Sequence, residues 1–298
     1  MYYYKLYDLK VKSDLKFPQL IECEDEAKWD LEVVSGVMPE NIVSRAEEKK
    51  YVFGSELSYL FNKTCCLLVE NGMRITYTLN EGGLEKYLQT YILGFGMAMV
   101  AMQRGMIAIH CSALADQCGA ILIAGESGAG KSTLATSLLE SGYRFMADDM
   151  ILVETAAGKA MAKPAFPYQK LCRNVVEEKG CNMDEIIYIN EEKDKFLVPF
   201  KGEFVREPLP VKAFIYLACT ECERVMVQEV KGIGKFNVCA NNLFLRKLLG
   251  QDRFLPHIGQ KCLEAAGAMP MYFVGRPEKI DTSKEVSEKV FEIISSLP

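Results

Sequence analysis

The chain has 298 residues, and its 35 Lys and Arg against 40 Asp and Glu give a formal net charge of −5. Apolar residues make up 49% and charged residues 25% of the chain, a balance typical of folded globular proteins and not of disordered ones. The mild negative charge argues against a nucleic-acid binder or a protein that docks on anionic membranes, because both need a basic surface.

The cysteines and the N-terminal sequence indicate the cellular compartment of the protein. The eleven cysteines are odd in number and irregularly spaced, and no leader-like pattern precedes them. We therefore expect a cytoplasmic protein with reduced thiols, most of them small core residues. The longest apolar run, residues 91–102, is shorter than the ~20 residues that span a bilayer, so it predicts a buried helix.

The N-terminal third predicts mostly strands. Residues 1 to about 80 contain short strand-like runs, and Asn71-Gly72 between two of them indicates a type I′ hairpin turn. From Leu84 to about Gln103 the pattern predicts one long helix, which Gly105 is well placed to end. We therefore expect a β-rich region over residues 1–100 with a long helix at its end, followed by a second domain over residues 101–298.

The second part of the chain alternates strands with helices. Residues 106–154 predict the order strand, turn, strand, helix, strand, strand. Further strands are expected at 211–217 and 271–274, and further helices at 241–249 and 283–296. This alternation favours the α/β class, in which a sheet is layered with helices.

A glycine-rich segment carries the strongest chemical signal. Residues 125–133 read Gly-Glu-Ser-Gly-Ala-Gly-Lys-Ser-Thr and fit the phosphate-binding pattern G-x-x-x-x-G-K-[ST]. An apolar run at 120–124 predicts a buried strand before it, and apolar residues at helical spacing predict a helix after it. Glycines permit a left-handed backbone, so consecutive N–H groups can converge on an anion at the helix N-terminus. The nucleotide-binding candidates are Gly125, Glu126, Ser127, Gly128, Ala129, Gly130, Lys131, Ser132 and Thr133.

Two residue types in this segment have individual roles. Lys131 would bring a full positive charge to the β- and γ-phosphates, and the Ser132 hydroxyl would ligate Mg²⁺. A glycine-rich turn that happens to precede a lysine is the alternative. The string Gly232-Ile-Gly-Lys235 also joins glycine to lysine, but it lacks the full spacing and predicts a turn.

Adjacent aspartates form a second candidate site. An apolar run from Tyr143 ends in Asp148 and Asp149, and Asp148 follows Lys131 by 17 residues. In a parallel α/β unit this strand end lies at the same edge as the loop. One carboxylate there would accept a proton from a nucleophile and the other would hold Mg²⁺. The alternative is a solvated turn with local hydrogen bonds.

The third candidate is His110. Alternation over residues 106–113 predicts a strand in which His110 and Ser112 lie on the same face. A short turn at 116–119 would place this strand beside the loop strand, so that His110 reaches bound phosphates; a hydrogen-bonded core histidine is the alternative. The sequence does not choose among five cations for a more distant phosphate contact: Arg206, Lys212, Arg246, Arg253 and Arg276.

Three strings together resemble a known family. His110-Cys-Ser, the glycine-rich segment, and the run from Tyr143 to Asp149 resemble the HPr kinase/phosphorylase catalytic domain, and still more the shorter HPr-kinase-related proteins. The resemblance is specific over about residues 105–155. A Leu-Glu-Ile-Arg-Gly-Leu-Gly stretch, which serves metal binding and phosphorolysis in HPr kinase itself, does not follow the aspartates, so the resemblance argues against HPr as the acceptor.

The resemblance implies a fold and a chemistry. The fold would be an α/β P-loop kinase of the HPr kinase and phosphoenolpyruvate-carboxykinase-like type, with residues 101–298 as the catalytic domain. ATP would be the phosphate donor, Asp148 the base that activates a serine hydroxyl, Asp149 a residue near Mg²⁺, and His110 a contact of the catalytic phosphate. HPr kinase relatives often form oligomers, which implies a homo-oligomer here.

Residues and resemblance together predict an ATP- and Mg²⁺-dependent kinase. It would phosphorylate a hydroxyl, foremost serine, on a peptide or small protein, with Lys131, Asp148 and His110 as catalytic residues. Residues 1–100 would recognise the substrate or a partner. A nucleotide-gated ATPase module without phosphotransfer and a kinase for free serine remain the alternatives.

Overall fold

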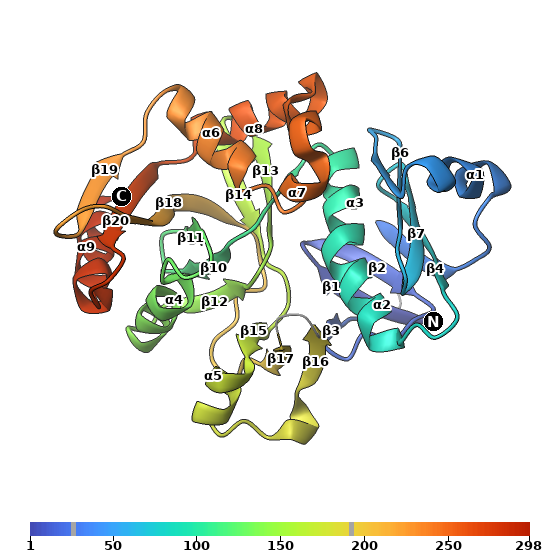
Figure 1. Ribbon diagram of the computed structural model, residues 1–298, viewed down its shortest axis with the longest axis horizontal. Helices are drawn as coiled ribbons and strands as arrows, with labels where there is room; N and C mark the ends of the chain where they lie inside the picture. The colour runs from blue at the N-terminus through green and yellow to red at the C-terminus, as the bar shows by residue number, and fades with distance from the viewer. Residues whose placement is uncertain (25–27, 191–193) are drawn as a thin grey trace. The chain divides into compact units, whose positions relative to one another are not determined.

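The computed structural model of the chain describes residues 1–24, 28–190 and 194–298 (Figure 1). The chain divides into two compact units, each assembled from separated stretches. Unit 1 comprises Met1–Met106, Phe166–Lys201 and Lys247–Leu249, and unit 2 comprises Ile107–Ala165, Gly202–Arg246 and Gly250–Pro298. Both units combine helices with sheets, so the protein is of the mixed α/β kind that the sequence predicts.

Unit 1 contains an eight-stranded sheet and a separate three-stranded sheet. The large sheet has the spatial order β3 (Ile21–Glu22), β1 (Tyr2–Leu6), β2 (Leu9–Ser13), β4 (Leu31–Ser35), β8 (Arg74–Leu79), β7 (Cys65–Glu70), β6 (Leu57–Phe61) and β5 (Tyr51–Phe53). The small sheet has the order β15 (Tyr168–Cys172), β17 (Lys195–Pro199) and β16 (Ile187–Asn190). The helical elements are α1 (Glu40–Glu48), α2 (Glu85–Tyr91), the π-helical η1 (Ile92–Gly96), α3 (Met97–Gln103), α5 (Arg173–Glu178) and the 3-10 turn η2 (Met183–Glu185).

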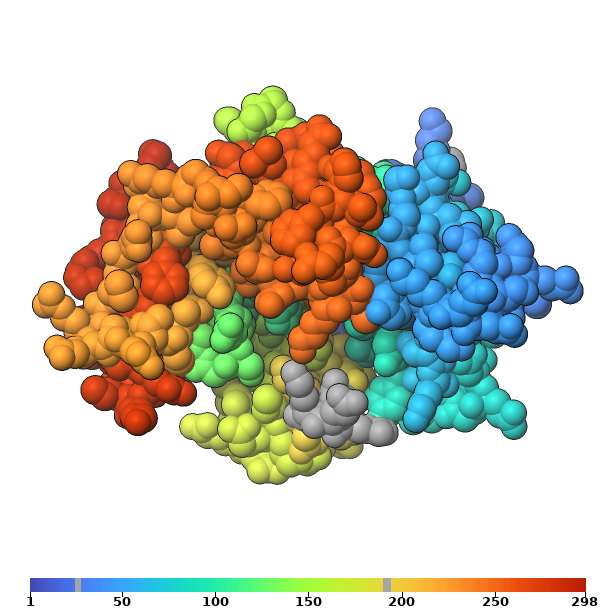
Figure 2. All heavy atoms as spheres, turned by 45° about the horizontal axis from the view of Figure 1, so that its top comes forward, coloured from blue at the N-terminus to red at the C-terminus, as the bar shows by residue number. Residues whose placement is uncertain are grey.

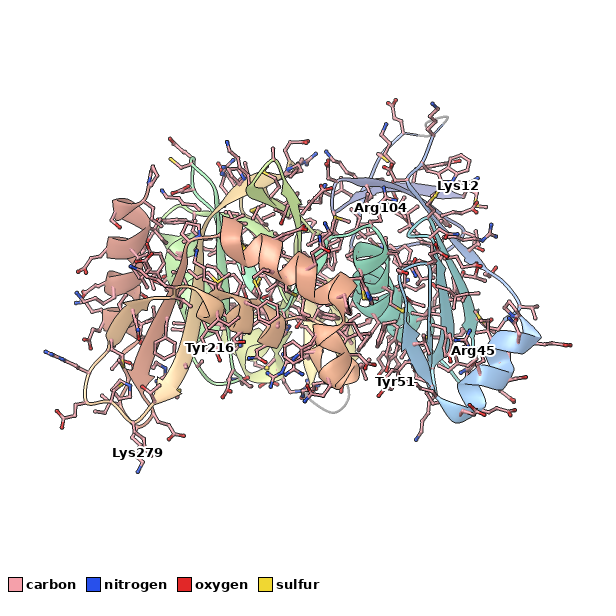
Figure 3. All side chains as sticks on the ribbon, turned by 90° about the horizontal axis from the view of Figure 1, so that it is seen from above. Lys12, Arg45, Tyr51, Arg104, Tyr216 and Lys279 are labelled. Atoms are coloured by element: carbon pink, nitrogen blue, oxygen red, sulfur yellow. The ribbon has the colours of Figure 1, made fainter. Side chains whose placement is uncertain are left out.

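The predicted hairpin and the predicted long helix both form in unit 1, and they contact each other. φ is positive at Asn71 and Gly72, as a type I′ turn requires. The helix runs without a break from α2 through η1 to α3, and its last turn holds the hairpin. The Gly72 N–H donates to Gln103 Oε1 at 2.6 Å, and Arg104, labelled in Figure 3, donates to the Gly72 carbonyl at 3.0 Å.

Unit 2 is built on a nine-stranded mixed sheet. Seven strands have the spatial order β12 (Arg144–Ala147), β10 (Ser112–Ala115), β11 (Ala120–Gly125), β18 (Leu209–Thr220), β14 (Lys159–Lys163), β13 (Ile151–Ala156) and β9 (Ile107–Ile109). In addition, β20 (Met271–Pro277) pairs with β18, and β19 (Met226–Glu229) pairs with β20. The helical elements of unit 2 are α4 (Lys131–Glu140), α6 (Ile233–Asn241), η3 (Gly250–Phe254), α8 (Pro256–Ala268) and α9 (Ser283–Ser296). The short α7 (Arg246–Leu249) starts in unit 2, and its residues Lys247–Leu249 belong to unit 1.

Strand directions bring several strand ends in unit 2 to one edge of the sheet. β10 is antiparallel to both β11 and β12, while β11 is parallel to β18 and β18 is parallel to β20. β11, β12, β18 and β20 therefore end at the edge where β10 begins. The loop strand and the strand before the aspartates thus run in the same direction and end at the same edge, as predicted, with the antiparallel β10 between them.

The core of unit 2 follows from the apolar sequence of its central strands. Every residue of β11 is buried, as its continuous apolar run predicts. Helix α4 packs on β10 and β11 with α9 beside it, and α8 packs on β9, β13 and β14 (Figure 1). Each fully buried aliphatic side chain in these layers contributes about 1.5–3 kcal/mol to folding. Within the described residues, no helix combines the length and the apolar character needed to cross a bilayer.

The helix predicted over 241–249 forms only over its last four residues. α6 ends at Asn241, and α7 begins only at Arg246. The turn between them forms backbone hydrogen bonds with the segment at β9 instead: the His110 N–H donates to the Asn242 carbonyl at 2.7 Å, and the Phe244 N–H donates to the Ala108 carbonyl at 2.9 Å. Long-range pairing thus overrides the local helical pattern.

Two further predicted elements differ from the structure. The strand expected over 106–113 is divided into β9 and β10 at His110 and Cys111, because β9 pairs with β13 whereas β10 pairs with β11 and β12. The turn expected at 232–235 is only the start of α6, since Gly232, with φ of 53°, directly precedes the helix.

The cysteines are all free thiols. The expectation that most of them are core residues is wrong, because only four of the eleven are buried: Cys65, Cys111, Cys239 and Cys262.

An ion pair at the opposite edge of the unit 2 sheet gives a test of the fold. Lys212 Nζ donates to Asp116 Oδ2 at 2.8 Å, and the lysine side chain is only 8% exposed. Burial alone would raise the pKa of Asp116, but Lys212 and the N–H groups of Cys118 and Gly119 bond the carboxylate and hold its pKa below the ordinary value. Because the pKa of Asp116 is lower in the folded than in the unfolded protein, its ionised carboxylate stabilises the fold at pH values above the unfolded-state pKa. This stability is lost as the pH falls through the folded-state pKa.

We expect Asp116→Asn to lower the free energy of unfolding by about 2 to 4 kcal/mol near pH 7, because Lys212 keeps a buried charge without its partner. The difference from the wild type should shrink once the pH falls below the ordinary Asp pKa of about 3.9 toward the lower folded-state pKa, because the wild-type carboxylate then also becomes protonated. Urea unfolding at neutral pH and in this acidic range measures the change. A difference that does not change with pH would contradict the ion-pair explanation.

Candidate functional site

The glycine-rich segment connects β11 to α4 at the shared strand edge of unit 2. Helix α4 begins at Lys131, and its N-cap Gly130 has φ of 103°. Gly125 and Gly128 also have positive φ, of 143° and 84°. Left-handed residues at these positions let successive N–H groups point toward one place, where the helix N-terminus adds further donors. The segment is exposed from Glu126 to Gly128, and green atoms of this part of the chain reach the surface in Figure 2. The backbone geometry therefore suits an anion.

Close packing explains why the first position of the segment is glycine. Gly125 pairs with Leu217 of the neighbouring strand β18. A Cβ atom at Gly125 would lie 2.1 Å from the Leu217 carbonyl oxygen, far inside van der Waals contact. A larger residue would therefore separate the two strands that fix the start of the loop.

Lys131 lies folded back on the loop that precedes it. Its Nζ donates to the carbonyl oxygens of Gly125, at 2.6 Å, and Glu126, at 2.9 Å. A phosphate oxygen is a stronger acceptor for an ammonium group than a neutral carbonyl. An anion in the loop can therefore draw this lysine away from the carbonyls, which leaves them exposed to water.

The two aspartates follow β12 at the same edge. Asp148 Oδ1 accepts a hydrogen bond from Ser112 Oγ at 2.8 Å, and Ser112, at the start of β10, is only 7% exposed. Asp149 has φ of 72°, a left-handed conformation that aspartate tolerates better than most residues. Ser112 of the neighbouring strand thus fixes the Asp148 carboxylate, and a tight turn fixes the position of Asp149.

His110 contacts the second aspartate. Its Nδ1 lies 2.8 Å from the Asp149 carbonyl oxygen and 3.6 Å from Asp149 Oδ1. Because a carbonyl oxygen only accepts, Nδ1 carries a hydrogen, and in the neutral ring the lone pair is on Nε2. The side chain is 47% exposed, so the alternative of a core histidine is wrong. The Phe244 ring lies 6.1 Å from the imidazole, beside the turn that holds the His110 backbone.

A buried thiol, which the sequence did not single out, lies among these charges. Burial raises the pKa of the Cys111 thiol, Asp148 and Asp149 raise it further, and Lys131 lowers it. All three charged groups thus influence the pKa of this one buried thiol, which lies at the break between β9 and β10.

The five cations that the sequence left open differ in their partners. Lys212 pairs with Asp116 at the opposite edge of the sheet. Arg253 donates to the Gly250 carbonyl, and Arg246 donates to the Asn241 carbonyl at 3.3 Å. Arg276 donates directly to the glycine-rich loop. Arg206 is exposed.

The oxygen donors suit a particular kind of metal ion. Among the described residues, no three His, Cys, Asp or Glu side chains form a group that could hold a metal. Mg²⁺ in phosphate-transfer sites takes most ligands from water and phosphates, and needs only one or two protein oxygens. The Ser132 hydroxyl and the Asp149 carboxylate are oxygen donors of the type that Mg²⁺ prefers.

The close approach at Gly125 gives a second test. We expect Gly125→Ala to lower the free energy of unfolding by about 3 kcal/mol or more, because its Cβ would collide with the β18 backbone. Gly142→Ala is the matched control: Gly142 also has positive φ, but its Cβ would meet nothing within 4 Å, so only the left-handed penalty of about 1–2 kcal/mol applies. Urea unfolding of both variants measures the difference, and equal losses would show that packing against β18 is not the reason.

Comparisons with known proteins point to one family. The family model described as HPr Serine kinase C-terminal domain matches residues 106–183. An HPr kinase/phosphorylase of Mycoplasmopsis pulmonis (strain UAB CTIP) is 24% identical over 178 residues, which cover 60% of this chain and 52% of that protein. This chain thus spans about half the length of the curated relative that it matches.

Solved structures also align with the chain. One of them, the Hpr(Ser) kinase/phosphatase from Coxiella burnetii, aligns at 12% identity over 63% of this chain and 94% of that chain, with a TM-score of 0.32. The sequence match covers the glycine-rich loop, His110 and both aspartates. Over residues 106–183, the chain is similar to the HPr Serine kinase C-terminal domain.

Proposed function

We propose that this chain is an ATP- and Mg²⁺-dependent kinase that transfers the γ-phosphate to a hydroxyl, foremost serine, of a peptide or small protein. One observation carries the proposal: the glycine-rich loop with Lys131 follows β11 and the aspartates Asp148 and Asp149 follow β12, two strands that end at the same edge of the unit 2 sheet. Phosphoryl transfer is catalysed mainly by positioning and by neutralising charge. Backbone donors, an ammonium group and a carboxylate pair at one edge provide both.

The proposed fold type is a P-loop kinase of the HPr kinase and phosphoenolpyruvate-carboxykinase-like kind. In this proposal residues 125–133 wrap the triphosphate, and their N–H groups bind its oxygens. Lys131 exchanges the Gly125 and Glu126 carbonyls for the β- and γ-phosphates. The exchange costs little, because each neutral acceptor is replaced by a charged one.

Asp148 is the proposed base. The hydrogen bond from Ser112 fixes the orientation of its carboxylate at the start of β10. As the acceptor oxygen forms a bond to the γ-phosphorus, the bond to the β-phosphate oxygen breaks, ADP leaves, and the hydroxyl proton passes to Asp148. The protonated carboxylate then releases the proton to water.

His110 and Asp149 complete the proposed site. The Nδ1 of His110 is engaged by the Asp149 carbonyl, so a phosphate oxygen would be contacted through Nε2. Ser132 and Asp149 are the residues that would hold Mg²⁺, which when bound neutralises charge on the phosphates. The left-handed backbone of Asp149 places its carbonyl at the histidine, so this residue has a positioning role as well.

The remaining assignments concern the rest of the molecule. We propose that residues 101–298 carry the chemistry and that residues 1–100 recognise the acceptor or a partner. We also propose a cytoplasmic homo-oligomer that binds neither nucleic acid nor membrane, in line with the net charge of −5.

A transfer assay tests the proposal directly. The full chain is incubated with Mg²⁺ and γ-labelled ATP, in separate reactions with a serine-containing peptide library, with HPr and with free serine. We expect label on peptide serine. Label on free serine would instead identify a metabolite kinase, and release of free phosphate with no labelled acceptor would identify an ATPase module. Lys131→Ala should abolish both transfer and calorimetric binding of Mg-ATP; a variant that keeps both would overturn the role of the loop.

Replacement of the proposed base gives a sharper prediction. Asp148→Asn keeps the shape of the side chain but removes the basic oxygen, so kcat should fall by about 10²- to 10⁴-fold while Mg-ATP affinity is retained. Asp149→Asn is the matched variant, because asparagine also tolerates the left-handed backbone there. The Asp149→Asn variant should mainly need a higher Mg²⁺ concentration to reach its full rate. Steady-state kinetics over a range of Mg²⁺ concentrations separates the two, and an unchanged kcat in Asp148→Asn would remove it as the base.

A further inference from the structure

We infer that Arg276 is a positioning residue that holds the glycine-rich loop in its anion-binding conformation. Arg276 lies on β20, and its strand partner is Cys219 of β18, the strand that also pairs with the loop strand β11. The arginine thus reaches the loop from the side opposite to β10 and the aspartates. This inference rests on the proposed function, in which the loop binds a nucleotide.

The guanidinium group bonds two successive carbonyls of the loop. Its Nη2 donates to the Gly128 oxygen at 2.9 Å, and its Nε donates to the Ala129 oxygen at 3.0 Å. A third bond, from Nη1 to the Pro277 oxygen at 3.1 Å, fixes the group to its own strand. The planar fork of arginine suits two neighbouring acceptors in a way that a lysine ammonium does not.

Because peptide groups are planar, these hydrogen bonds also orient N–H donors of the loop. A trans peptide is planar, and its N–H points away from its C=O. By fixing the Gly128 and Ala129 carbonyls, Arg276 therefore also fixes the direction of the N–H groups of Ala129 and Gly130. The Ala129 N–H points across the loop, where it donates to the Glu126 oxygen at 3.2 Å.

Lys131 and Arg276, the two cations that bond to loop carbonyls, therefore have different roles. Lys131 holds the carbonyls of Gly125 and Glu126 and is the group that a phosphate would recruit. Arg276 holds the carbonyls of Gly128 and Ala129 and keeps these bonds when the loop binds an anion. Its charge also offsets the partial negative charge of these oxygens, which would otherwise repel phosphate.

The test compares Arg276→Gln and Arg276→Lys with a matched control, Arg144→Gln. Arg144 also donates from Nη2 to a backbone carbonyl, that of Asp116 at 2.8 Å, but at the opposite edge of the same sheet. Two readouts are used: hydrogen exchange of the peptide covering residues 125–134 in the nucleotide-free protein, and calorimetric affinity for Mg-ATP with kcat and KM.

We expect Arg276→Gln to speed exchange in the loop peptide and to weaken Mg-ATP binding by about 10- to 100-fold, as the loss of two charge-assisted hydrogen bonds implies. KM for ATP should rise more than kcat falls, because the chemical groups stay in place. Arg276→Lys should be intermediate, and low concentrations of guanidinium ion should restore part of the affinity of Arg276→Gln. Arg144→Gln should lose stability without either effect.

The two proposals fail in different ways. Unchanged loop exchange in Arg276→Gln overturns the positioning role, whatever the wild type does with nucleotide. Faster exchange with unchanged Mg-ATP affinity overturns it as well. Absence of Mg-ATP binding in the wild type overturns the proposed function, while the exchange readout still decides whether Arg276 orders the loop.

Discussion

The candidate site depends on the antiparallel pairing of β10 between β11 and β12. This pairing makes β11 and β12 run in the same direction, so the glycine-rich loop and the aspartates emerge at one edge. It also places the first residue of β10, Ser112, against Asp148, and puts His110 and Cys111 at the break before that strand. The proposed catalytic groups His110, Asp148 and Asp149 therefore lie directly beside the ends of paired strands, a rigid frame of the kind that precise phosphoryl transfer needs.

The loop itself is supported on its other side by β18 and β20. Gly125 fits against the β18 backbone only because it has no Cβ, and Arg276 reaches from β20 to the far part of the loop. The sheet thus supplies acidic and imidazole groups from one pair of strands and loop support from another. In the proposed function, this division lets the loop keep its shape while Lys131 exchanges the Gly125 and Glu126 carbonyls for phosphate.

Local patterns predicted much of this arrangement. The strand–loop–helix around residues 120–140 and the helix at 283–296 were predicted correctly, because each is specified by its own apolar periodicity and glycines. The split at His110 was not predicted, because it depends on β9 and β10 pairing with different strands. The turn at Asn242 was not predicted, because its hydrogen bonds join segments more than a hundred residues apart. Arg276 could only be named as one of five cations for the same reason, since its loop partner Ala129 is 147 residues away.

The assembly of unit 1 from three stretches limits how the chain can be divided experimentally. Phe166–Lys201 groups with the N-terminal stretch, and within unit 1 the Lys86 ammonium on α2 lies 5.4 Å from the Tyr188 ring on β16. A fragment that begins at residue 107 would keep the small β15–β17–β16 sheet but lose the partners against which it packs. Such a truncation would expose apolar surface and invite aggregation. Isolation of the kinase-like unit therefore requires a short linker in place of residues 166–201, and a single cut is not sufficient.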